Sequence, residues 1–277
     1  MNRSTVEITV YGLCKTYPPI PRGLGLSQLL RRSKGTGTLA LDHVSFQIHG
    51  GEWFGVLGPN GAGKTTFCDI LLDITHPTQG SIRINEIDVN KQHSKLKGML
   101  CSIDYWSLDP RLRVRTFLEK SGAEWMLPRR QTRKRIEYLA ELFEMKAKLD
   151  DWVVRLSGGM KKKINLMAAL MSGAPALVLD EPTVGLDVFS RQSLYAQLKE
   201  YQKDFGATIA WTTHNLDEAE QVCDRIAVLN AKLLALATPQ DLVQAMKKAN
   251  LEQAFIEMIQ KDRDQTKQGE SQRGDNR

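Results

Sequence analysis

One stretch of the chain, around residue 60, restricts the fold more than any other: an apolar run, a glycine-rich loop and a helical segment follow one another. Residues 58–65 fit the pattern G-x-x-x-x-G-K-[ST], and the apolar run at residues 53–57 precedes them. Glycines turn the backbone tightly and point its N–H groups inward, so such a loop wraps an anion at the positive end of the next helix. A strand, a loop and a helix in this order predict an α/β fold with a phosphate-binding loop rather than an ordinary glycine-rich turn.

The phosphate-binding loop supplies most of the predicted nucleotide contacts. Lys64 is placed to reach the β- and γ-phosphates of ATP, and Thr65 to hold Mg²⁺. The residues of this loop that we expect to bind ATP are Gly58, Pro59, Asn60, Gly61, Ala62, Gly63, Lys64, Thr65 and Thr66.

A second apolar run, residues 176–179, is followed by two carboxylates. Such a run is typical of a buried parallel strand, and ligands bind at the carboxyl edge of open α/β sheets. Asp180 is therefore predicted to hold Mg²⁺, mainly through water, because Mg²⁺ takes few protein carboxylates. Glu181 is predicted to be the general base that orients or deprotonates a water attacking the γ-phosphate. A strand that merely meets a helix cap is the alternative, and the phosphate loop upstream argues against it.

His214 follows a further apolar run, residues 207–212, which is typical of another buried strand. A single histidine after such a strand is more often a structural residue than a catalytic one. Its position at a carboxyl edge, like that of Glu181, favours a place in the site.

The order of these motifs resembles that of the nucleotide-binding subunits of ABC transporters, over roughly residues 5–240. Residues 156–160, Leu-Ser-Gly-Gly-Met, match the family signature, residues 182–187 match the segment after the catalytic glutamate, and residues 212–214 match the switch histidine. The resemblance implies the α/β P-loop NTPase fold of ABC ATPases. That fold has a RecA-like core, an antiparallel β subdomain and an inserted α-helical subdomain.

Subunits of this family meet head to tail, so the resemblance implies a homodimer or a pair of ABC ATPase subunits. Ser157 and the N–H groups of Gly158 and Gly159 would act in trans, on the γ-phosphate bound by the other subunit. Asp187 would lie at the subunit interface and link the two sites.

The resemblance also implies a catalytic role for His214, which would contact the γ-phosphate beside Lys64 and Glu181. The paired subunits would bind ATP and Mg²⁺, close on ATP and open after hydrolysis, and so move helices of a separate transmembrane permease. The chain is thus expected to be the ATP-hydrolysing subunit of an ABC transporter. Export is the preferred direction, because residues 251–259 resemble the closing helix of exporters of the drug, lipid and sodium type.

The residues around the signature support an anion site independently of the resemblance. Ser157 is placed as a helix N-cap, and a capped helix start binds anions. Met160, Ile164 and Met167 then recur with helical spacing, which predicts a core-facing stripe rather than a ligand site. The lysines at 161–163 are expected to form a solvated face rather than to contact phosphate.

One position departs from the family pattern. The family carries a glutamine a few tens of residues after the phosphate-loop lysine, whereas the matching segment here holds Asp104, and no glutamine occurs between Gln92 and Gln131. A carboxylate brings charge and only accepts hydrogen bonds, so Asp104 as a metal ligand predicts an altered Mg²⁺ dependence or slower turnover. A shifted loop in which Asp104 caps a turn is the alternative.

Tyr17 is expected to stack on the adenine ring, since the family places an aromatic residue ahead of the first long strand. Stacking alone does not select a base, so ATP and GTP would both fit. Tyr11 is the rival, although its place in an apparent strand favours a packing role.

The chain is expected to divide into an ABC nucleotide-binding domain at 1–240, a C-terminal helix at 241–260 and a tail at 261–277. Residues 105–170, rich in helix formers and charges, would be the helical subdomain. Prolines and glycines around a basic amphipathic stretch mark residues 18–38 as an inserted loop, either a plain surface loop or a contact to lipid headgroups or a membrane subunit. The tail is expected to be disordered, because it holds no large apolar residue.

Composition limits the remaining classes. The chain has 277 residues, a net charge of +6 and a pI near 9.1, and the tail contributes to this modest excess, so no direct nucleic-acid contact is expected. No run reaches the roughly eighteen apolar residues of a membrane span, and the start lacks the apolar core of a secretion signal. Four scattered cysteines suit a reducing compartment. We therefore expect a cytoplasmic protein, peripheral on the inner face of the cell membrane.

Two other functions stay open. One is a soluble ABC ATPase acting on the ribosome or nucleic acid, although translation-factor members carry two nucleotide domains per chain and repair members a long coiled coil. The other is a subunit that binds ATP only to dimerise, for which Asp104 is the one sequence hint. Intact Lys64, Asp180, Glu181 and His214 argue against that second alternative.

Overall fold

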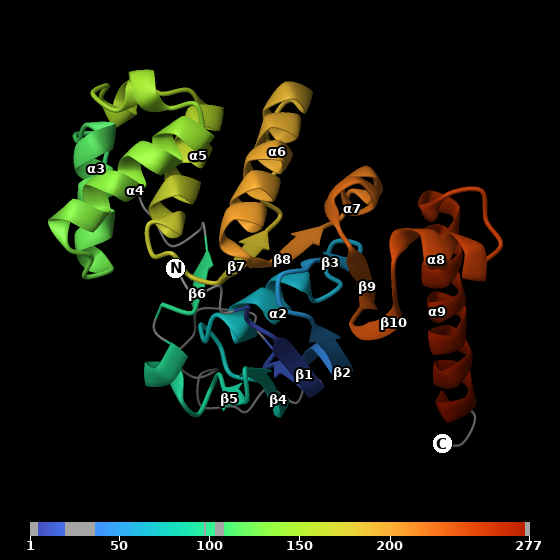
Figure 1. Ribbon diagram of the computed structural model, residues 1–277. Coiled ribbons are helices and arrows are strands. Elements are labelled where there is room, and N and C mark those ends of the chain that lie inside the picture. The colour runs from blue at the N-terminus through green and yellow to red at the C-terminus, as the bar shows by residue number, and fades with distance from the viewer. Residues whose placement is uncertain (1–4, 20–36, 97, 103–107, 275–277) are drawn as a thin grey trace, which may run out of the picture.

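The computed structural model describes residues 5–19, 37–96, 98–102 and 108–274, with side chains up to residue 265 except at 93 and 94. Asp104 and most of the expected insertion at 18–38 lie outside the described residues. The elements, shown in Figure 1, are in chain order β1 (Ile8–Tyr17), β2 (Thr38–Ile48), β3 (Trp53–Leu57), α2 (Lys64–Leu71), β4 (Gln79–Ile84), β5 (Ile87–Asp88), η1 (His93–Leu96), β6 (Leu100–Ser102), α3 (Val114–Glu124), α4 (Arg129–Leu142), η2 (Lys146–Lys148), η3 (Val153–Arg155), α5 (Gly158–Leu170), β7 (Ala176–Asp180), α6 (Val188–Phe205), β8 (Thr208–Thr213), α7 (Leu216–Val222), β9 (Arg225–Asn230), β10 (Lys232–Ala237), α8 (Pro239–Ala245) and α9 (Leu251–Gly274).

The described strands form two sheets. The smaller sheet has the order β2-β1-β4-β5 and is antiparallel. The larger sheet has the order β10-β9-β3-β8-β7-β6, and its neighbouring strands run parallel except for β10, which is antiparallel to β9. A mainly parallel sheet with its own antiparallel companion confirms the α/β P-loop fold predicted from the motifs.

Alternate side chains of the central strands point into two different hydrophobic cores. In β3, Trp53 and Leu57 belong to one core, and Phe54 and Val56 to the other. Helices α5, α6 and α7 contribute to the first core, whereas α2 and the antiparallel sheet contribute to the second. Because both faces of the strand are covered, β3 is buried throughout and reads in the sequence as a continuous apolar run.

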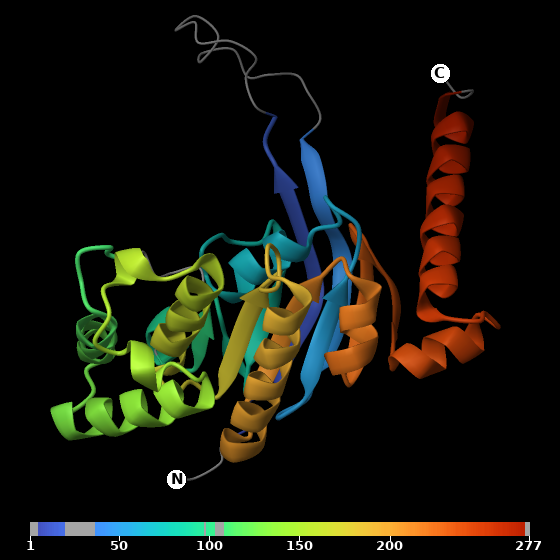
Figure 2. The ribbon, with the colours of Figure 1, turned by 90° about the horizontal axis from the view of Figure 1, so that it is seen from above.

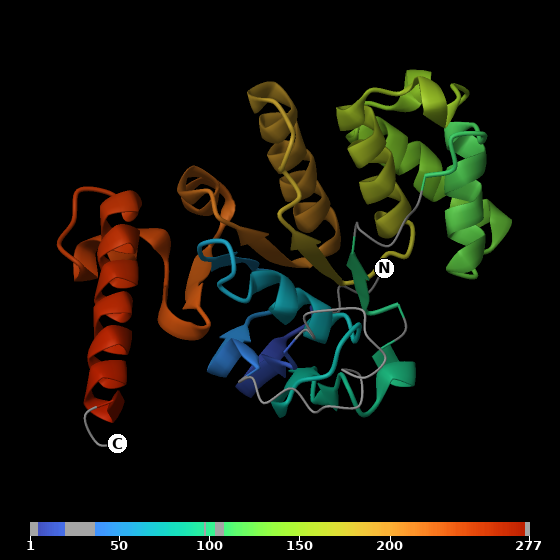
Figure 3. The same ribbon diagram turned by 180° about the vertical axis from the view of Figure 1, so that it is seen from behind.

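Helices α3, α4 and α5 pack on one another beside β6, at one end of the larger sheet, as Figures 1 and 3 show. Their contacts are apolar and include Phe117 of α3, Ile136 of α4 and Ile164 of α5, all buried in the first core. These helices lie in the stretch predicted to be helical near residues 105–170. The limits of that subdomain stay a prediction.

The C-terminal helices lie at the opposite end of the larger sheet, next to β10 (Figures 1 and 2). Where one helix and a disordered tail are expected from the sequence, the structure has two helices, α8 and α9, and α9 continues to Gly274. Polar contacts hold α9 just beyond residue 260. Asp262 is only 6% exposed, accepts a hydrogen bond from Asn230 at 2.6 Å and pairs with Lys232 at 2.6 Å. A search for large apolar residues misses an anchor of this kind.

None of the helices in the described part of the chain is long and apolar enough to cross a membrane.

Candidate nucleotide-binding site

A loop of residues 58–63 joins β3 to α2, as predicted. Gly63 has a φ of 97°, and a Cβ there would lie 2.4 Å from the Ala40 carbonyl oxygen. A Cβ on Gly58 would lie 2.5 Å from the Leu229 carbonyl oxygen. Both positions therefore need glycine, because the backbone of other strands comes too close for any side chain.

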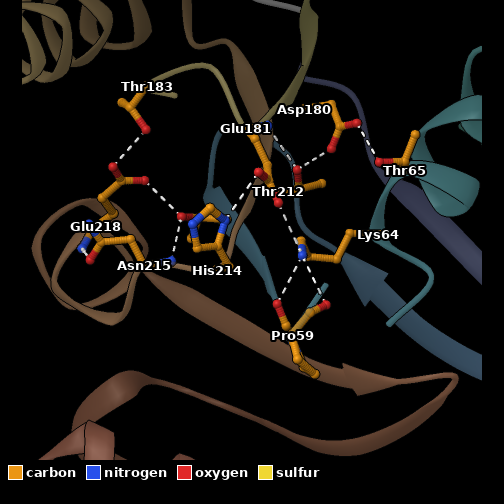
Figure 4. A network of polar contacts seen from close by, with 12 residues as sticks. Pro59, Lys64, Thr65, Asp180, Glu181, Thr183, Thr212, His214, Asn215 and Glu218 are labelled. Carbon is orange, nitrogen blue, oxygen red and sulfur yellow. Dashed lines mark hydrogen bonds and ion pairs between the residues drawn. The ribbon is translucent and has the colours of Figure 1, made fainter. Parts of the chain in front are cut away.

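Lys64, the first residue of α2, turns back into this loop (Figure 4). Its ammonium group donates hydrogen bonds to the carbonyl oxygens of Gly58 at 2.9 Å and Pro59 at 3.2 Å. The same nitrogen lies 3.1 Å from Oε1 of Glu181, and the side chain is only 5% exposed. The loop therefore holds a buried positive charge next to the carboxylate that follows β7.

Asp180 lies at the end of β7, beside Thr65 of α2 and Thr212 of β8. The Thr65 hydroxyl donates to Oδ2 of Asp180 at 2.7 Å, and the Thr212 hydroxyl donates to Oδ1. Thr212 also accepts a hydrogen bond from the Glu181 N–H at 3.0 Å. A hydroxyl and a carboxylate thus meet at the mouth of the loop, and these are the oxygen ligands that hard cations prefer.

Glu181 lies between the loop and the end of β8. Its Oε1 faces Lys64, and its Oε2 lies 3.1 Å from Nδ1 of His214. Burial alone would raise the pKa of Glu181, but the hydrogen bonds from His214 and Lys64, together with the charge of Lys64, outweigh it and lower the pKa. Glu181 is therefore kept ionised, as a proton acceptor must be. Its φ of 43° is a conformation that non-glycine residues rarely adopt.

A cleft of about 490 Å³ brings these groups together. Its lining residues are Ala40, Asn60, Gly61, Ala62, Gly63, Lys64, Thr65, Thr66, Asp180 and Glu181. Such a volume is of the size that small-molecule ligands occupy in proteins.

Tyr17 ends β1 close to this cleft. Its hydroxyl lies 3.5 Å from the Thr66 hydroxyl, and the Lys15 ammonium lies 5.0 Å from the centre of its ring. Tyr11, for which packing is expected, is instead 47% exposed in β1, with the Arg83 guanidinium 5.4 Å from its ring centre. Of these two tyrosines, Tyr17 is the one that lies near the loop.

The signature residues lie elsewhere, at the start of α5. Ser157 is the N-cap of that helix, as predicted, and its hydroxyl accepts a hydrogen bond from the Met160 N–H at 3.3 Å. Ile164 and Met167 are buried and Met160 is partly buried against the same core, which confirms the predicted apolar stripe. None of residues 157–159 lines the cleft at the phosphate loop.

Two of the three lysines that follow the signature differ from the predicted solvated face. Lys162 donates to the carbonyl oxygens of Pro182 and Val184, and Lys163 donates to the Ser193 hydroxyl at 3.2 Å. The two lysines are half-buried. They tie α5 to the segment after β7, a contact between distant parts of the chain that charge counting along α5 does not reveal.

Two groups near the site were not predicted from the sequence. The sequence predicts Thr212 only at the end of a strand and in the match at residues 212–214, whereas the register of β7 and β8 sets it directly opposite Asp180. Glu218, in the first turn of α7, is buried behind His214. Aligning the two strands in parallel predicts the position of Thr212, whereas nothing local marks Glu218 out from the other acids of α7.

Comparisons with known proteins agree with this geometry. Residues 41–184 match the ABC transporter family. The chain is similar to the Nod factor export ATP-binding protein I of Burkholderia pseudomallei (strain 1710b), with 38% identity over 211 residues, which cover 75% of this chain and 68% of the relative. It is also similar to the protein of the same name from Rhizobium leguminosarum bv. viciae, with 36% identity over 213 residues, 75% of this chain and 67% of the relative.

Solved structures of ABC transporter proteins are also similar to this chain. An ATP-binding subunit of an ABC transporter superposes with a TM-score of 0.73 at 25% identity, over 91% of this chain and 99% of that one. The cbiO1 protein of Clostridium perfringens superposes with a TM-score of 0.71 at 26% identity, over 87% and 91%. The phosphate loop, the acids at the strand edge and these likenesses have one explanation: the chain belongs to the ABC transporter family, as an ATP-binding subunit that hydrolyses ATP.

Proposed function

We propose that this chain works in a pair, with a second copy or a related ATPase subunit, and that the pair clamps two ATP molecules to drive export through a separate transmembrane permease. The pair would sit peripherally on the inner face of the cell membrane. Export is supported by the curated relatives, whose names are those of export ATP-binding proteins. A permease partner is supported by cbiO1, which is described as part of an ABC transporter complex.

One observation supports the pairing: the start of α5 does not line the cleft at the phosphate loop, although Gly159 borders a second cavity together with Asp180 and Glu181. Lys64, Thr65, Asp180 and Glu181 line the cleft at the phosphate loop, whereas the capped start of α5 at Ser157 does not. A capped helix start presents free N–H groups that attract an anion. A second subunit in head-to-tail orientation brings its own residues 157–159 to the γ-phosphate in this cleft.

Catalysis follows from the contacts around Glu181. In the structure Lys64 pairs with Glu181 at 3.1 Å. When phosphates enter the loop, the Lys64 ammonium turns to the β- and γ-phosphate oxygens and gives up its carboxylate partner. Glu181 then accepts a hydrogen bond from the attacking water, while His214 keeps hold of the other carboxylate oxygen and reaches the γ-phosphate.

The ligand set beside the loop fits Mg²⁺. Thr65 and Asp180 bring a hydroxyl and a carboxylate oxygen within 2.7 Å of each other, and Asp104 is proposed as a further ligand. When bound, the ion would neutralise charge on the β- and γ-phosphates. The protein's part is to hold its oxygens in place, which Thr212 does by donating to Asp180.

The pairing is tested by the Glu181→Gln chain, which keeps the shape of the side chain but loses the basic oxygen. We expect it to bind ATP and to migrate as a dimer in size-exclusion chromatography with light scattering, whereas the unmodified chain hydrolyses ATP and returns to monomer. Lys64→Ala is the matched control, since it removes phosphate binding and stays monomeric. A Glu181→Gln chain that binds ATP and remains monomeric contradicts the pairing.

The permease and the direction of transport need a second experiment. The Glu181→Gln chain is purified from its native host in ATP and mild detergent, and the co-purifying proteins are identified. A multi-spanning membrane protein supports the transporter. Ribosomal or nucleic-acid partners without such a protein would contradict it and favour the soluble ATPase instead.

A further inference from the structure

We infer that Glu218 is a positioning residue for ATP hydrolysis: its buried carboxylate ties the segment after Glu181 to the turn that carries His214, and so keeps these two side chains in contact. Glu218 touches neither the cleft nor the loop, and it acts through its neighbours. The inference rests on the proposed function of Glu181 and His214.

The contacts of Glu218 join two separate strand ends (Figure 4). Its Oε1 accepts a hydrogen bond from the Thr183 hydroxyl at 2.6 Å, two residues after Glu181. Its Oε2 accepts a hydrogen bond from the Thr213 hydroxyl at 2.8 Å, directly before His214. One carboxylate therefore fixes the positions of both chain segments that leave the edge of the sheet.

The turn around His214 is closed by the same group of contacts. The Thr213 hydroxyl oxygen accepts a hydrogen bond from the Asn215 N–H at 2.9 Å while it donates to Glu218. The Asn215 side chain in turn caps α7 by accepting from the Asp217 N–H at 3.0 Å. His214 itself is 50% exposed, so packing alone does not hold its ring. Its direction is set by the hydrogen-bonded residues on either side.

Burying a carboxylate costs free energy, so the contacts that compensate this cost hold Glu218 firmly in place. Glu218 is 4% exposed, and an ionised carboxylate in such a place is unfavourable unless hydrogen bonds or opposite charges compensate. Arg191 of α6 lies 3.8 Å from Oε1, and the two threonine hydroxyls and the Tyr195 side chain hydrogen-bond to the same carboxylate. Burial, and next the charge of Glu218, raise the pKa of Tyr195, so that phenol stays un-ionised beside the carboxylate.

A carboxylate suits this position better than other side chains. Thr213 already accepts a hydrogen bond from the Asn215 N–H, so its own hydrogen must go to an acceptor, and Glu218 offers two acceptor oxygens at the right separation. A glutamine keeps the length of the side chain and one acceptor. Glu218→Gln should therefore rescue part of what Glu218→Ala loses.

The experiment compares the steady-state hydrolysis of ATP by the full-length chain and its variants. For Glu218→Ala we expect kcat to fall by about tenfold or more while KM changes by less than about twofold, because the nucleotide contacts are intact. Glu218→Gln should fall between Ala and the unmodified chain. Asp217→Ala is the matched control: it removes an exposed acid from the same first turn of α7 and should keep the normal rate.

A double-mutant cycle separates positioning from a general loss of stability. If Glu218 acts through His214, the variant Glu218→Ala/His214→Ala should be no more than about twofold slower than His214→Ala alone. Additive losses, or an equal loss in Asp217→Ala, would overturn the inference. If Glu218→Ala does not fold, Thr183→Val and Thr213→Val take its place in the experiment. Each removes one hydroxyl and keeps the buried acid, and each should lower kcat in the same way.

Failure of this inference can be told from failure of the proposed function. Normal hydrolysis in Glu218→Ala and in both valine variants, with hydrolysis lost in Glu181→Gln, refutes the positioning role and leaves the function in place. Unchanged hydrolysis in Glu181→Gln refutes the function itself.

Discussion

At the scale of single residues, the contacts of Glu181 suit its proposed role as a base. The backbone at Glu181 is held at φ 43°, and its carboxylate lies between the side chains of Lys64 and His214. Strain of this kind persists only where the surrounding contacts impose it, and it gathers at functional sites. Here the Thr212 hydroxyl holds the Glu181 N–H, so the conformation is fixed by a neighbouring strand.

The pKa of Glu181 gives a prediction at this scale. Hydrogen bonds from His214 and Lys64 favour the ionised carboxylate and lower its pKa below the ordinary value of 4.5, against the effect of burial. Removing one donor in His214→Ala should therefore raise the pKa. As the pH falls, the variant then protonates Glu181 and loses its base before the unmodified chain does.

The measurement is a pH titration of the glutamate side-chain carbons by NMR in the nucleotide-free chain. The Glu181→Gln spectrum identifies the signal, because that signal disappears. A pKa of Glu181 that stays the same or falls in His214→Ala would show that the contact with His214 is not a hydrogen bond to the carboxylate.

At the scale of elements, the N-cap residue of α5, Ser157, has both a structural role and a proposed functional role. Ser157 caps α5 in its own chain, and in the proposed pair it faces the phosphate of the other. The helix is held beneath by a buried apolar face that includes Ile164 and Met167. The same hydroxyl thus has a structural role inside one subunit and a proposed binding role across two.

Two substitutions separate these roles. Ser157→Ala removes the cap and should lower the free energy of unfolding by about 0.5–2 kcal/mol. Ser157→Asp keeps a good capping group but places a negative charge where the γ-phosphate of the other subunit is expected. We expect Ser157→Asp to unfold like the unmodified chain in denaturant and yet fail to dimerise in ATP. Normal ATP-dependent dimerisation of Ser157→Asp would exclude the role in trans.

At the scale of the whole molecule, the cleft and the signature lie on different parts of the chain. The phosphate loop leads into α2, between the two sheets, whereas α5 packs with α3 and α4 at one end of the larger sheet (Figure 1). In the proposed pair, each part completes the site of the other chain. The active unit is therefore predicted to hold two composite sites.

Mixing two inactive chains tests this arrangement. Lys64→Ala destroys the phosphate loop and keeps the signature, whereas Ser157→Asp keeps the loop and spoils the signature. Each variant alone should be inactive, but a mixed pair has one intact composite site. Equal mixing should restore up to about half of the normal hydrolysis rate, since neither variant pairs with itself and each mixed pair has one of its two sites intact. No recovery would contradict sites shared between subunits.

The limits of prediction from sequence differ between elements. The loop at 58–65 and the acids after β7 were found because their residue types are tied to one local geometry. The contacts of Asp262 in α9 with Asn230 and Lys232 of a distant hairpin cannot be predicted from the local sequence. The same holds for Lys162, whose partners lie after β7. Contacts between remote segments leave no local pattern.

Residue types and their spacing are enough to predict the local chemistry: a loop whose glycines allow close backbone approach, a lysine and a threonine after it, and acids at the end of a buried strand. Which groups meet depends on how the strands are arranged in the sheet. The tertiary structure sets Thr212 opposite Asp180 and buries Glu218 between two strand ends. The physical reason is that glycine conformation and strand burial depend on neighbouring residues, whereas a hydrogen bond between strands depends on their order and register in the sheet.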